Sequence, residues 1–267
     1  MKIQRQWEEH FPERIFIMKV NDNTKKLICI VLLLAVWQAA AVIVDKSILL
    51  ASPVQVLVRL FSLIGDPGFF RSIWFSFSRI AAGFFSGLAV GALCAVLSGS
   101  SGWIRAALDP VFNVAKSVPV ASFIIIALVW LSSGKLSSFI SFLMVVPVVY
   151  TNLLGGIEAL DPEMKEMAKV FGISPARRLI YIDLPQLRPY ITSACRLSLG
   201  LAWKSGIAAE VIGLPSGSIG RMLYDAKVYF DTADLFAWTL VIVLISVLCE
   251  KLFLLAVDLL YRRLEKL

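Results

Sequence analysis

Several charged side chains interrupt stretches of the chain that are otherwise apolar. Arg79, Arg196, Lys204 and Glu210 all lie within such stretches. A charge in hydrocarbon is costly, so these side chains must face protein or water, and such positions often handle ions or solutes. Arg196, Trp203 and Glu210 are seven residues apart, which places them within about 40° of one another on a helix. All five residues are candidates for a polar path whose net positive charge favours a small anion; the alternative is a set of fixed structural ion pairs.

A polar segment, residues 156–189, carries the clearest local signals. Asp161-Pro162 is typical of a helix start, with an N-cap followed by a proline in the first turn. Gly172 can end this helix in the left-handed conformation. Ser174-Pro175 repeats the start signal, and it predicts a second helix running toward Leu184-Pro185. The segment therefore predicts two short helices joined at a glycine.

The first of these helices is predicted to be amphipathic. Its apolar face and its charged residues separate as follows: Met164, Met167, Ala168 and Phe171 share the face, whereas Glu163, Glu166 and Lys169 lie elsewhere. An interfacial helix lying on lipid would show this pattern. A helix that fits a groove in another protein would show it equally, and methionine suits such an adaptable contact.

The elements that must position these residues are membrane helices. The chain has 267 residues, of which 58% are hydrophobic and 17% charged, and its mean hydropathy is +0.80. A soluble domain cannot bury that much apolar surface. Hydropathy predicts an all-α fold of about six spans, at residues 27–44, 73–98, 111–131, 136–155, 190–212 and 235–257.

Two further patterns indicate how the helices pack. Small residues recur at a strict spacing of four in the second span, at Gly83, Gly87, Gly91, Ala95 and Gly99. Such a stripe lets a neighbouring backbone approach closely, and Arg79 continues it, so we expect Arg79 to face protein. Ser52-Pro53 predicts a short amphipathic helix that runs to about Ile64 outside the membrane.

The distribution of Lys and Arg predicts the orientation. Most of these residues outside the spans lie before residue 27, within 156–189 and after residue 257, and short cytoplasmic segments retain positive charge. We therefore expect a cytoplasmic tail at 1–26 and a permease domain at 27–267, with its core at about 70–260 and both termini in the cytoplasm. The net charge of +7 forms no basic stripe with aromatics, which argues against nucleic-acid binding.

The polar segment resembles a known motif. Glu166-Met167-Ala168, Gly172 three residues later and Ile182-Asp183-Leu184-Pro185 after nine more are similar to the EAA loop of binding-protein-dependent ABC importer permeases. Met167 departs from the alanine usual there. The blocks at 76–83 (SFSRIAAG) and 199–210 (LGLAWKSGIAAE) most resemble the permeases for aliphatic sulfonates, taurine and nitrate.

The resemblance implies a function and a set of partners. The loop would dock in a groove of a separate ATPase subunit, through residues that include Glu166, Ala168 and Gly172, with Leu184 and Pro185 at its end. The expected partners are that ATPase, an extracytoplasmic solute-binding protein, a second permease copy and membrane lipid. The chain itself would be no enzyme and would need no cofactor or metal. We expect it to move a small anion across the inner membrane by alternating access.

Rival functions lack their expected residues. No G-x-x-x-x-G-K-[ST] stretch is present, so ATP would be hydrolysed by another chain. An ion-coupled secondary transporter, the leading alternative, normally places acids or histidines at mid-membrane, whereas the only histidine is His10 in the predicted tail. A membrane enzyme would need a nucleophile elbow or a metal motif, and neither occurs.

Overall fold

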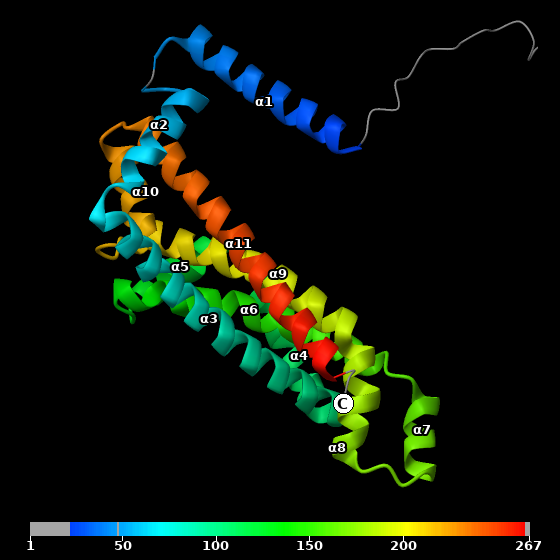
Figure 1. The fold of residues 1–267 in the computed structure, drawn as a ribbon. Helices are drawn as coiled ribbons and strands as arrows, with labels where there is room; N and C mark the ends of the chain where they lie inside the picture. Colours follow the sequence, from blue (N-terminus) through cyan, green and yellow to red (C-terminus); the bar gives the residue numbers. More distant parts are fainter. Residues whose placement is uncertain (1–21, 47, 265–267) are drawn as a thin grey trace, which may run out of the picture.

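The computed structural model describes residues 22–46 and 48–264. Within these ranges the chain is helical and contains no strand (Figure 1), which confirms the predicted all-α class. The elements are α1 (Asp22–Val44), α2 (Pro53–Ile64), α3 (Pro67–Ser100), α4 (Gly102–Ser117), α5 (Val120–Leu128), α6 (Ser133–Glu158), α7 (Pro162–Val170), α8 (Pro175–Arg178), the π-helical turn η1 (Leu179–Asp183), α9 (Leu184–Gly213), α10 (Ile219–Val228) and α11 (Thr232–Leu264). Most of the predicted tail, including His10, lies outside the described residues.

Four described helices, α1, α3, α6 and α11, are long and apolar enough to cross a membrane. Helix α9 has 30 residues, but charged side chains make it more polar than those four. The predicted third span, residues 111–131, is wrong as a single helix, because α4 and α5 meet at a bend of 98°. Pro119 lacks an amide N–H and its ring disfavours a helical residue before it, so Val118 is extended, with φ −79° and ψ 131°.

The centre of the molecule is α6, which packs against α3 and α9 in the two most extensive contacts between helices. The glycine stripe of α3 lets a neighbouring backbone approach closely, as predicted, and the structure shows that this neighbour is α6. A Cβ atom on Gly83 would lie 2.3 Å from the carbonyl oxygen of Ser138, and one on Gly91 would lie 2.8 Å from that of Val146. The two backbones can approach this closely only because the side chains are absent.

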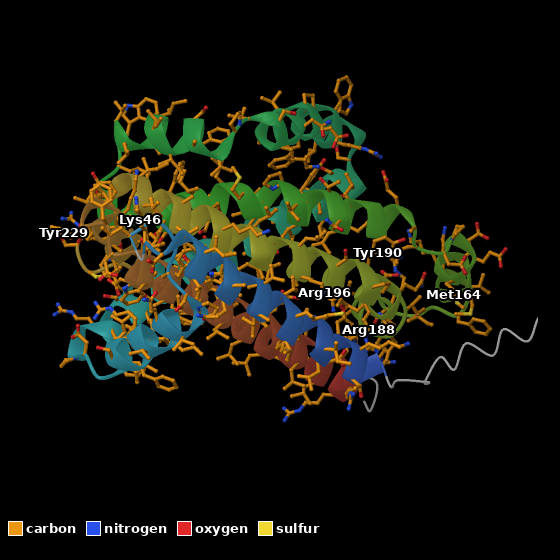
Figure 2. All side chains as sticks on the ribbon, turned by 90° about the horizontal axis from the view of Figure 1, so that it is seen from above. Lys46, Met164, Arg188, Tyr190, Arg196 and Tyr229 are labelled. Carbon is orange, nitrogen blue, oxygen red and sulfur yellow. The ribbon has the colours of Figure 1, made fainter. Side chains whose placement is uncertain are left out.

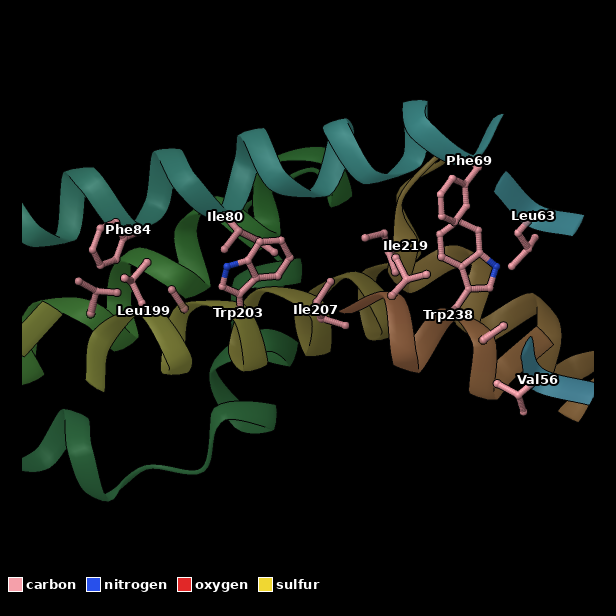
Figure 3. Close-up of a cluster of buried hydrophobic side chains, with 14 of the residues drawn as sticks. Val56, Leu63, Phe69, Ile80, Phe84, Leu199, Trp203, Ile207, Ile219 and Trp238 are labelled. Atoms are coloured by element: carbon pink, nitrogen blue, oxygen red, sulfur yellow. The ribbon is translucent and has the colours of Figure 1, made fainter. Parts of the chain in front are cut away.

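A large apolar cluster joins α3 and α9 to α2, α10 and α11 (Figure 3). Phe69 of α3 packs on Trp238 of α11, with ring centroids 5.3 Å apart. Trp203 of α9 packs on Phe77 at 6.4 Å. Because α2 and α10 contribute to this cluster, their position relative to the bundle is fixed by packing.

The short helices outside the central bundle lie at its two opposite ends. Helices α2 and α10 lie at one end and α7 and α8 at the other, where α11 also ends (Figure 1). Helix α2 begins with a capping box formed by Ser52 and Gln55 and ends at Ile64, which confirms its predicted bounds. Most of helix α1 lies apart from the bundle, although the ring of Trp37 packs on a phenylalanine of α11. It is joined to the end near α2 by the indole N–H of Trp37, which donates to the carbonyl of Ala51 at 3.1 Å.

Candidate functional site

Helix α7 is capped at both ends as the sequence predicts. The carboxylate of Asp161 accepts a hydrogen bond from the N–H of Glu163 at 2.8 Å. At the other end Gly172 has φ +62°. The N–H of Gly172 donates to the carbonyl of Lys169 and that of Ile173 to the carbonyl of Ala168, which is the Schellman arrangement. These bonds hold a nine-residue helix that would be too short to form by itself.

The apolar side chains of α7 point away from the rest of the chain. Phe171 is 76% exposed and Val170 82%, and Met164 and Met167 are also exposed. Figure 2 shows Met164 at the far end of the molecule from Tyr229. Ala168, predicted to share this exposed face, is instead fully buried against the rest of the chain. The open apolar surface is therefore made by two methionines, Phe171 and Val170, the last of which the sequence analysis did not single out.

Polar side chains brace the segment around α7. The side chain of Gln186 accepts a hydrogen bond from the N–H of Asp161 at 2.9 Å, which ties the start of α7 to α9. Arg178 of α8 pairs with the buried carboxylate of Asp183 at 3.2 Å. Sequence reasoning missed all three roles; the Ile182-Asp183-Leu184-Pro185 motif was the only signal near them. The brace connects α7 mechanically to the long helix that follows.

The helix predicted to end at Leu184-Pro185 does not end there. Residues of α8, η1 and α9 follow one another without a non-helical residue, from Pro175 to Gly213. The N–H of Leu184 donates to the carbonyl of Leu179, five residues back, and this π-turn accommodates the missing N–H of Pro185. Leu184 is half-buried and Pro185 is exposed. One helical run thus connects the α7 region to the opposite end of the bundle.

The predicted path residues divide into two groups. Lys204 is exposed and makes no hydrogen bond or ion pair within the described part of the chain. The side chain of Arg196 is 63% exposed, and its one ion pair among the described residues, with Glu250 of α11, is 3.6 Å long. These two cations are accessible on the surface of α9.

The other three predicted path residues are enclosed by protein. Trp203 is buried in the apolar cluster. The guanidinium of Arg79 donates to the carbonyl of Gly134 at 2.6 Å and lies over the ring of Phe75, so Arg79 faces protein as expected. Glu210 is fully buried, and its carboxylate accepts the hydroxyl of Ser76 at 2.6 Å. No sequence signal connects residues 76 and 210, which are far apart in the chain.

A basic pocket lies between α9 and α11 at the same end of the bundle as α7. It has a volume of about 460 Å³ and is lined by Arg188, Thr192, Ser193, Arg196 and Asp258 together with Pro189 and Leu197. Arg188 pairs with Asp258 at 2.8 Å. The hydroxyls of Thr192 and Ser193 make no hydrogen bond among the described residues. Guanidinium and hydroxyl donors in one pocket can bind an oxyanion.

Comparison with known proteins gives consistent matches. Residues 87–266 match the family described as binding-protein-dependent transport system inner membrane component. The nitrate import permease protein of Synechocystis sp. is 30% identical over 209 residues, which is 74% of this chain and 75% of that protein. The taurine transport system permease protein of Escherichia coli is 28% identical over 226 residues, 82% of each. A Synechocystis bicarbonate transport system permease protein is 30% identical over 162 residues, 60% of this chain and 58% of that protein.

Proposed function

The chain belongs to the family of binding-protein-dependent transport system inner membrane components, and from this premise we propose that it carries a small anion by alternating access driven by a separate ATPase. It is a multi-pass membrane protein and the permease subunit of an ABC importer. The ATPase, the solute-binding protein, the second copy and the substrate are parts of the proposal.

The observation that carries the proposal is the exposed apolar face of α7. Helix α7 is capped at both ends, tied to α9 through Gln186 and set away from the bundle. Met164, Met167, Val170 and Phe171 would be desolvated in a groove of the ATPase, and methionine adapts to such a groove. Glu163 and Glu166 are exposed beside them and can pair with the rim. A braced helix passes on a push that a loose loop would absorb.

The charges of α9 support an anionic substrate. Lys204 and Arg196 are the two predicted path residues that remain accessible. Their stripe of α9 also exposes Leu197 and Leu201, so a second copy that packed against this face would enclose the two cations between the subunits. The basic pocket at Arg188 and Arg196 continues the positive surface toward the α7 end. Nitrate, taurine and bicarbonate, named for the relatives, each carry a compact anionic group.

The orientation is proposed from charge. Basic residues cluster around α7 and α8 and at the end of α11, so this end of the bundle would lie in the cytoplasm, where an ATPase is found. Helices α2 and α10 would then face the solute-binding protein. Reporter fusions after Leu267 and near Arg221 should report cytoplasmic and external positions respectively, and the reverse pattern would refute this orientation.

Reconstitution tests the function directly. The permease, its ATPase and its solute-binding protein are placed in liposomes, and uptake of labelled nitrate, taurine and bicarbonate is measured with and without ATP. Uptake should require ATP and the binding protein. Phe171→Ala should weaken ATPase binding, whereas Lys169→Ala, which alters α7 away from its apolar face, should not. Uptake driven by an ion gradient without ATP would instead support a secondary transporter.

A further inference from the structure

The carboxylate of Glu210 lies where four helices meet, at the end of the bundle opposite α7. Glu210 belongs to α9 and is fully buried. Its Oε2 accepts the hydroxyl of Ser76 from α3 at 2.6 Å and the N–H of Gly220 from α10 at 3.2 Å. Ser137 of α6 lies beside the same carboxylate. Burying a carboxylate is costly unless hydrogen bonds replace those it made to water.

Glu210 and Ser76 hold the first turn of α10. The N–H of Ile219 donates to the Ser76 hydroxyl oxygen at 3.0 Å, and this hydroxyl in turn donates to Glu210. The N–H of Gly220 is therefore bonded to the Glu210 carboxylate directly, and the N–H of Ile219 is connected to it through the Ser76 hydroxyl. An anion is favoured at this position by the free N–H groups and by the helix dipole. The contact is also close, since a Cβ atom on Gly220 would lie 2.3 Å from the Cβ of Glu210.

The link between α9 and α10 contains two residues with positive φ. Leu214 has φ 51° and Gly217 has φ 78°. They turn the chain back within five residues, so that the end of α9 and the start of α10 meet at Glu210. Helix α10 also packs on α11 and contacts α3. Its hydrogen bond to Glu210 of α9 is thus a separate contact, through which a movement of α9 can displace α10.

The same helical run that ends beside Glu210 begins at α8. Every residue from Pro175 to Gly213 is helical. Near the beginning of this run, Gln186 is hydrogen-bonded to the residue that caps the start of α7. A displacement of α7 would therefore move this run, and the Glu210 contact would transmit the movement to α10. No other described element has both a tie to α7 and a charged hydrogen bond to α10.

We propose that Glu210 is a positioning residue that couples α10 to α9, so that ATPase-driven movement of α7 displaces α10 at the opposite end of the bundle. The proposal rests on the proposed coupling role of α7. Ser76 is part of the coupling because it relays the N–H of Ile219. The other oxygen, Oε1, and the hydroxyl of Ser137 are buried without a hydrogen-bond partner in the described structure. The carboxylate thus has an unused acceptor that can pair with Ser137 after a small shift of α9 against α6.

The test measures the position of α10 and the efficiency of transport in the reconstituted complex. Spin labels introduced through non-natural amino acids at Lys227 of α10 and Arg71 of α3, both exposed, report the distance between these helices. Measurements compare the nucleotide-free and ATP-trapped complexes of the wild type, Glu210→Gln and Ser76→Ala. Ser78→Ala is the matched control, because this serine lies on the same helix but bonds only to the carbonyl of Phe75.

In the wild type and in Ser78→Ala we expect the label distance to change with ATP. In Glu210→Gln and Ser76→Ala we expect this change to disappear while ATP hydrolysis continues. Uptake per ATP should fall about tenfold, because Ser76→Ala removes the hydrogen bond to the carboxylate and Glu210→Gln removes the charge that strengthens it. If both variants move α10 and transport like the wild type, the proposal is overturned. If Glu210→Gln fails to fold, Ser76→Ala decides alone; if even the wild type shows no ATP-driven uptake, the proposed function fails instead.

Discussion

The interface between α3 and α6 and the surface of α7 are both built from small or apolar residues at helical spacing, yet they differ in what completes them. The glycines of α3 contact α6 so closely that added Cβ atoms would clash. The apolar side chains of α7 contact little in this chain, and Phe171 is 76% exposed. One pattern is completed within the chain, whereas the other needs a partner.

This difference separates defects of folding from defects of function. A change in the α3–α6 interface should lower the free energy of unfolding, because the folded chain depends on this close packing. A change in α7 should leave the fold intact and weaken association with the ATPase. A change at the exposed cations of α9 should affect neither property and should reduce transport alone.

Gly83→Ala should give the largest loss of stability. Its new Cβ would lie 2.3 Å from the carbonyl oxygen of Ser138, so α3 and α6 must separate, at a cost of about 3 kcal/mol. The measurement is thermal unfolding of the detergent-solubilised permease. Gly155→Ala is the matched control, since a Cβ there meets nothing within 4 Å, and alanine is the better helix former. Equal melting temperatures for the two variants would contradict the interface argument.

Local signals account for the features that the sequence predicted well. The caps at Asp161, Gly172 and Ser52 depend on neighbours within a few residues, and the glycine stripe depends on one helical period. The break at Pro119 was missed because hydropathy alone treats an apolar run containing a proline as continuous. Such a proline disfavours a helical residue before it, and that signal was present.

Contacts between distant segments could not be predicted. The bond between Ser76 and Glu210 joins residues 134 positions apart, and periodicity places Glu210 on a polar arc without saying what it faces. The same periodicity grouped Trp203 with Arg196, although the structure buries the first and exposes the second. Helical spacing predicts which residues share a face, and only packing decides which face is covered.

Gly172→Val should have the next largest effect, and only on α7. Gly172 has φ +62°, where a β-branched residue costs about 1–2 kcal/mol or more. The cap of α7 would be distorted, and we expect weaker binding of the ATPase in a pull-down while the melting temperature of the permease stays unchanged. Gly172→Asn is the control because asparagine tolerates positive φ. Wild-type binding by the valine variant would argue against this loop as the docking element.

Asp161→Ala should have a smaller effect at the other end of α7. Loss of the N-cap bond to Glu163 should cost about 1 kcal/mol of local helix stability. Hydrogen exchange of the amides at 163–171 should become about fivefold faster, the factor that corresponds to this energy. Asp161→Asn keeps an acceptor and should exchange as the wild type does. Unchanged exchange in the alanine variant would mean that the tie from Gln186 suffices to hold the helix.

Lys204→Leu and Arg196→Leu should have the smallest effect on stability. Lys204 has no partner among the described residues, and the pair between Arg196 and Glu250 is long and exposed, so each change should alter the free energy of unfolding by about 0.5 kcal/mol or less. Uptake of the anion should nevertheless fall, because two copies of each cation would be removed from the proposed path. Lys204→Arg keeps the charge and should retain transport.

The measurements are ATP-driven uptake, basal ATPase activity and melting temperature for each variant. We expect reduced uptake with unchanged basal ATPase activity and melting temperature, whereas Gly83→Ala is expected to lower the melting temperature. If the leucine variants instead melt early, these cations have a structural role and the path must lie elsewhere.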